Sequence, residues 1–169
     1  MCNPPALIEF IDVDEADGSA IRMLRYSNVS PRDVIADLYI LNERSWDITY
    51  EGAFAAALIA YAAIAKFIRY VEGDNDAKND WERDYVLVTK PKYDTVSYVY
   101  TFYITHFINK KTTLTIKKRT AKGLEVIFEG TLQEAYEKFC KDSHKDGAHV
   151  NRQIFDIVDS LERWNELLK

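Results

Sequence analysis

The sequence contains few cysteines, which can crosslink a chain, and few histidines, which often act in catalysis. Of its 169 residues only two are cysteine, Cys2 and Cys140, and three are histidine. Two cysteines do not make a disulfide framework, so we expect reduced thiols in an intracellular, cytoplasmic protein. The N-terminus also lacks the basic and apolar regions of a secretory signal. These absences argue against a small secreted scaffold.

The alanine-rich run Gly52–Ala65 has no charged residue, but it is short for a membrane span. A spanning helix needs about 20 predominantly apolar residues, and shorter runs are more often core helices. Lys66 and Arg69 then interrupt the segment. We therefore predict no membrane association. We expect instead a soluble helix that ends near Gly73, is buried nearly all round and forms the packing spine of the N-terminal half.

Motifs of well-known enzymes are missing as well. The chain has no G-x-S-x-G elbow, no P-loop and no G-x-G-x-x-G turn. Cys140, His144 and His149 have a spacing that suggests zinc, but they lack a clear fourth ligand. The acidic segment from Asp74 does not fit an EF-hand loop. The sequence therefore predicts no cofactor, no metal site and no defined catalytic residue.

Secondary-structure patterns run through the whole chain. Two short apolar stretches around the pair Asp17-Gly18 predict a β-hairpin, and Ser30-Pro31 predicts the start of a helix that ends near Arg44. Thr131 and Glu134 form a capping-box pattern that opens another helix. Alternating residues predict strands at 85–90, 93–107, 112–119 and 124–130, and apolar spacing predicts a last helix at 151–168.

Together these patterns predict a single α+β domain over residues 1–169. We expect an antiparallel β-meander covered by C-terminal helices, with an N-terminal β-hairpin and the Ala-rich buried helix. The acidic loop at 73–84 is a possible internal boundary between the two halves.

Charge is distributed unevenly. Residues 109–123, the basic segment, carry six bases and no acid, whereas the net charge of the whole chain is -5. A basic hairpin on an acidic body can steer an acidic protein surface or a polyanion towards one edge. Lysines on an exposed hairpin also prevent edge-to-edge pairing of sheets, which is the simpler explanation.

Our leading hypothesis is a small non-enzymatic protein of the inhibitor, immunity or accessory-factor type that binds another protein or protein complex. The first alternative is nucleic-acid binding through the basic segment. The second is an undetected hydrolase or transferase with a pocket near His106, since His106 ends the aromatic face of a predicted strand. A homo-oligomer through the Ala-rich helix is also conceivable. The predicted partner-binding residues are Lys110, Lys111, Lys117, Lys118, Arg119, Lys122, Trp81, Asp80 and Glu82.

Overall fold

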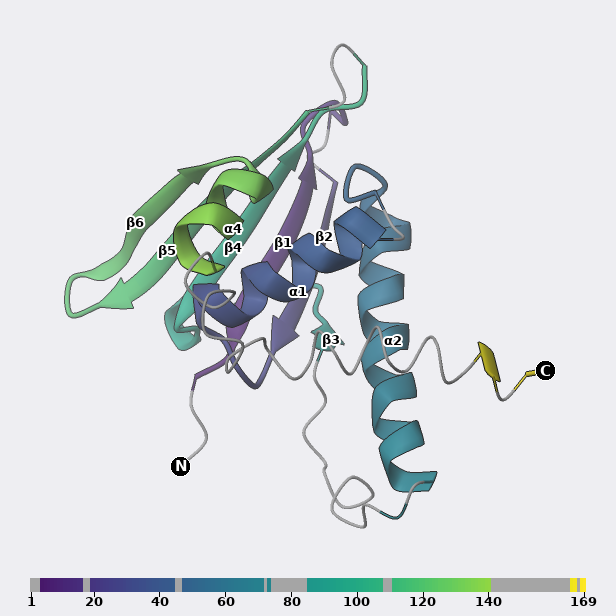
Figure 1. Ribbon diagram of the computed structural model, residues 1–169. Coiled ribbons are helices and arrows are strands. Elements are labelled where there is room, and N and C mark those ends of the chain that lie inside the picture. Colours follow the sequence, from purple (N-terminus) through teal and green to yellow (C-terminus); the bar gives the residue numbers. More distant parts are fainter. Residues whose placement is uncertain are drawn as a thin grey trace.

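The fold is seen in a computed structural model of the chain (Figure 1). It describes residues 4–16, 19–44, 47–71, 73, 85–107, 111–140, 165, 166, 168 and 169. Within these residues a mixed six-stranded sheet is combined with helices, which confirms the predicted α+β class. None of the described helices is long and apolar enough to span a membrane.

The sheet has the strand order β3-β2-β1-β4-β5-β6. Its only parallel pair within the described chain is β1 with β4, at the centre, and all other neighbours are antiparallel. The strands are β1 (Ala6–Asp12), β2 (Ala20–Arg25), β3 (Tyr85–Leu87), β4 (Tyr98–Ile104), β5 (Thr112–Thr120) and β6 (Gly123–Gly130).

Three predicted features of the strand-rich half need correction. The segment 93–107 is not one strand, because a short 3-10 turn, η1 (Tyr93–Thr95), precedes β4. The strand after the acidic loop is shorter than predicted and leaves the meander, since β3 pairs with β2 at the far edge. Strands from both sides of the loop therefore share one sheet, and only β4, β5 and β6 form the meander.

The helices α1 (Pro31–Arg44) and α4 (Leu132–Cys140) lie side by side across one face of the sheet, and α2 (Glu51–Val71) lies beside β2 and β3 (Figure 1). Both predicted start signals are confirmed. Ser30 precedes α1 and its carbonyl accepts from Val34 N, while Thr131 Oγ1 accepts from Glu134 N at 3.1 Å. The predicted last helix lies mostly outside the described residues, as does the Asp17-Gly18 turn.

The core lies between the sheet and these helices. Phe10 of β1 stacks on Phe102 of β4 and meets the ring of Phe54 of α2 edge-on. The core face predicted for β4 is confirmed, because Tyr100, Phe102 and Ile104 are fully buried. The opposite, Thr-rich face was expected to meet water, but there only Tyr103 among Val99, Thr101 and Tyr103 is exposed, since Val99 packs on Leu7 and Thr101 donates to Glu9. We call the face turned away from α1 and α4 the open face of the sheet.

The prediction that the Ala-rich helix is buried nearly all round is wrong for its described side chains. Phe54, Ala55, Ala57 and Leu58 are buried. The side turned away from the core is exposed, and it carries Gly52, Ala53, Ala56, Ala60 and Ala63. The helix lies at the edge of the sheet, beside its short outer strand, so only one side meets the core. Alanine is compatible with either environment, which is why composition did not reveal this.

Candidate functional site

Within the described residues, the basic segment forms strand β5 and the turn that follows it. The described lysines lie in two groups, Lys111 before the strand and Lys117, Lys118 and Lys122 near its other end. Nine strand residues extend about 30 Å, so these groups do not make one compact patch. Lys117 pairs with Val99 on the open face, whereas its neighbour Lys118 is exposed on the face that carries the helices.

Arg119 has a structural role. Its Nε donates to the carbonyl of Val96 at 2.7 Å, and its terminal nitrogen donates to the carbonyl of Tyr93. These bonds fasten the turn before β4 to the end of β5. The guanidinium group of Arg119 is therefore already committed to backbone carbonyls of the same chain.

Several predicted residues lie outside the described part of the chain. These are Lys110, the acidic-loop residues Asp80, Trp81 and Glu82, and the two histidines His144 and His149. Cys140 is described and is buried, with its thiol donating to the carbonyl of Arg32 at 3.4 Å. Burial raises the pKa of this thiol to about 12, with a further contribution from Asp33. Cys140 is therefore a packed core thiol.

His106 lies in a cluster with two carboxylates. It follows the end of β4, and its Nε2 lies 3.3 Å from Glu51 Oε2 and 3.6 Å from Asp12 Oδ2. Asp12 ends β1, and Glu51 begins α2. One ligand atom from each of these residues lies within 4.8 Å of the others. The histidine side chain is 30% exposed, so the cluster is open to solvent.

A second polar cluster lies on the open face around Glu9, which is only 4% exposed. Its Oε1 accepts from Thr101 Oγ1 at 2.7 Å. Its Oε2 accepts from Tyr93 OH at 2.9 Å and from Arg22 Nε at 3.1 Å. Burial raises the pKa of Tyr93, and its hydrogen bond to Glu9 adds to this rise. Because the Glu9 carboxylate has three partners, we interpret this cluster as a structural link between strands.

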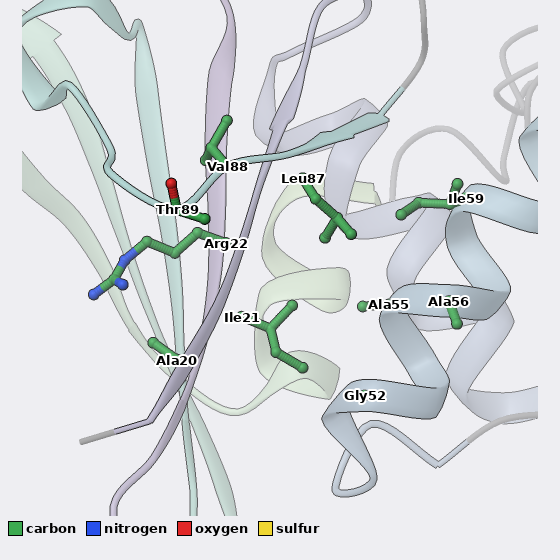
Figure 2. A pocket seen from close by; sticks show the side chains of 10 residues that line it. All are labelled: Ala20, Ile21, Arg22, Gly52, Ala55, Ala56, Ile59, Leu87, Val88 and Thr89. Carbon is green, nitrogen blue, oxygen red and sulfur yellow. The ribbon is translucent and has the colours of Figure 1, made fainter. Parts of the chain in front are cut away.

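An open groove of about 500 Å³ separates α2 from the edge of the sheet (Figure 2). Ile21 of β2 and Leu87 of β3 point into it, whereas the guanidinium of Arg22 points away from it. On the helix side it is bordered by Gly52, Ala55, Ala56 and Ile59. The groove is therefore lined mainly by apolar side chains, and it continues the exposed side of α2.

Sequence reasoning singled out His106 but missed its neighbours. Asp12 lies in a predicted hairpin strand and Glu51 at a helix start, so neither looked exceptional alone. Only the parallel pairing of β1 with β4 brings Asp12 to the same edge as His106. The groove was not anticipated either, because β3 was assigned to the meander.

Known proteins give no further guidance on the site. No protein-family model, no curated protein and no solved structure matches this chain.

Proposed function

We propose that this protein binds another protein, and that it does so through the exposed side of α2 and the adjoining groove. We call this area the α2 surface. It consists of Gly52, Ala53, Ala56, Ala60 and Ala63 with the groove residues Ile21, Ile59 and Leu87. The observation that carries the proposal is the lack of charge on a helix side that is exposed.

An exposed helix side normally carries charged and polar residues opposite its apolar stripe. Here no charged residue occurs between Gly52 and Ala65, although the same stretch is exposed at Ala53, Ala56 and Ala60. Leu87 next to it is 61% exposed, which is high for a leucine. Contiguous exposed apolar surface of this kind is typical of protein interaction sites. Small side chains also let a partner approach the helix backbone closely.

The basic segment is a second contact area in this proposal. Lys111, Lys118 and Lys122 are exposed and would favour an acidic partner. Nucleic-acid binding is less well supported, because the described lysines lie in separate groups and Arg119 bonds to its own backbone. The protein we envisage is an adaptor or inhibitor without catalytic activity of its own.

Site-specific photo-crosslinking tests the proposed surface. A photoreactive residue is placed at Ala56, at Lys118 and, as a control on α4, at the exposed Glu137. In extract of the native host we expect a protein adduct from Ala56 and none from Glu137. The partner identified in this way is then purified. Its affinity for the chain should fall at least tenfold with Ala56→Arg and stay nearly unchanged with Glu137→Ala.

Other results would contradict the proposal. Adducts only from Lys118 would move the interface to the basic segment, and nucleic-acid adducts would support the alternative class. An adduct of the chain with itself, together with a sedimentation coefficient that rises with concentration, would instead identify a homo-oligomer.

A further inference from the structure

The edge where β1 and β4 end has the composition of a metal site. Parallel strands bring their carboxyl ends to the same edge of a sheet, and Asp12 pairs with Ile104 at that edge. His106 lies two residues beyond Ile104, on the same face. Glu51 arrives from the first turn of α2. Three segments that are far apart in the sequence thus contribute one imidazole nitrogen and two carboxylate oxygens.

The spacing of these atoms suits a small divalent ion. Ligands of zinc lie about 2.0–2.2 Å from the metal, so two ligands at the tetrahedral angle are about 3.4 Å apart. The distances from His106 Nε2 to the two carboxylate oxygens, 3.3 Å and 3.6 Å, bracket this value. A metal could therefore be accepted with small adjustments of the side chains.

Asp14 holds the cluster in place. Its backbone N–H donates to Asp12 Oδ1 at 3.0 Å, which leaves Asp12 Oδ2 on the side of His106. Its own carboxylate accepts from the backbone N–H of His106 and from that of Phe107. Asp14 thus fixes both the strand end that carries Asp12 and the turn that carries His106. Such supporting bonds are characteristic of metal centres.

The charge balance of the cluster also favours a cation. Among the described residues, His106 is the only ion-pair partner of either Asp12 or Glu51. The described part of the chain also has two buried side-chain oxygens without a hydrogen-bond partner, Thr49 Oγ1 and Thr112 Oγ1. Both belong to segments that border the cluster. Thr49 comes two residues before Glu51, and Thr112 pairs with Ile104.

We infer that Asp12, Glu51 and His106 bind a divalent first-row transition metal, and that zinc fits best. Mixed imidazole and carboxylate ligands suit such ions, whereas magnesium prefers oxygen ligands alone. Three protein ligands leave a fourth position to water, which is the open arrangement of zinc sites. This inference is independent of the α2 surface.

Zinc binding to the intact, metal-stripped chain tests the site by isothermal titration calorimetry. We expect one zinc ion per chain with a micromolar or tighter Kd, retained in excess magnesium. Asp12→Asn and His106→Ala should each weaken binding at least tenfold. Asp14→Asn acts only through the ligands and should weaken it by about tenfold to a hundredfold. Circular dichroism of each variant checks that the fold is kept.

The matched control is His144→Ala, which removes a histidine of the other zinc-like spacing in the sequence. Full binding by this variant, with loss in His106→Ala, supports the inferred site. Loss in His144→Ala with full binding by His106→Ala would overturn it. Wild-type protein that takes up no zinc would also overturn it and would identify the cluster as an ion pair of histidine with two carboxylates.

Discussion

At the scale of single residues, the buried ion pair of Arg25 and Asp37 joins β2 to α1. Arg25 NH1 lies 2.6 Å from Asp37 Oδ2, and both side chains are at most 1% exposed. Arg25 also donates to Tyr85 OH at 2.9 Å and to the carbonyl of Ser27. Burial alone would lower the pKa of Arg25, but its interactions with Tyr85 and Asp37 raise it. The pair therefore ties β2 to α1 and β3.

Removing one partner of this pair should be costly. We expect Asp37→Ala to lower the free energy of unfolding by about 3–5 kcal/mol, because it leaves the Arg25 charge buried without its carboxylate. Replacing both residues with apolar ones, as in Arg25→Met with Asp37→Leu, should restore much of the stability. Urea unfolding of the three proteins measures this. Equal losses in the single and double variants would show that the uncompensated Arg25 charge is not the source of the loss.

At the scale of elements, α2 shows how one helix can serve two environments. Phe54 and Leu58 anchor it in the core, and both are fully buried. The alanines near these two anchors lie either on the buried or on the exposed side of the helix, so their contributions to stability depend on position. Ala57 is 6% exposed, whereas Ala60 is exposed. The exposed side is free to contact a partner, and the buried side determines how closely the helix approaches the sheet.

This asymmetry predicts different effects for the same substitution. Ala57→Leu should lower the free energy of unfolding by about 1–3 kcal/mol, because extra methylene groups overpack the core. Ala60→Leu should change it by less than about 0.5 kcal/mol, as surface substitutions usually do. Chemical denaturation of both variants provides the comparison. A large loss in Ala60→Leu would mean that this side of α2 is covered, and the α2 surface would then be unavailable to a partner.

At the scale of the whole molecule, the central pair of β1 and β4 joins the two halves of the chain. Pairing of β1 with β4 joins the N-terminal hairpin and the meander into one sheet. In addition, β3 from the second half of the chain pairs with β2 of the hairpin. The rings of Phe10 and Phe102 stack across it.

A joined sheet should unfold as one unit. Phe102→Ala in β4 should lower the free energy of unfolding by about 3–5 kcal/mol. Hydrogen exchange should show the same loss of protection for amides of β2 and of β5, since both strands depend on the central pair. If β5 lost its protection while β2 kept it, the two halves would be separate cooperative units.

Much of the fold was predictable from the sequence because local signals carry it. The helix start at Ser30-Pro31, the capping box at Thr131 and the alternation in β4 and β5 each depend on neighbours within a few residues. These signals gave most of the element types, but not the burial of Val99 and Thr101 on the face of β4 that was expected to meet water. They also indicated α+β architecture, and the burial of Tyr100 and Phe102 follows the predicted alternation.

The sequence by itself determined which segments form helices and strands, since backbone propensity, capping and side-chain periodicity act locally. Only the tertiary structure decided which strands pair. It placed β4 parallel to β1 and β3 beside β2, so that Asp12, Glu51 and His106 meet at one edge. It also decided which alanines of α2 are buried. Strand pairing and helix packing are settled by contacts between distant residues, and a side chain as small as alanine carries no local sign of its environment.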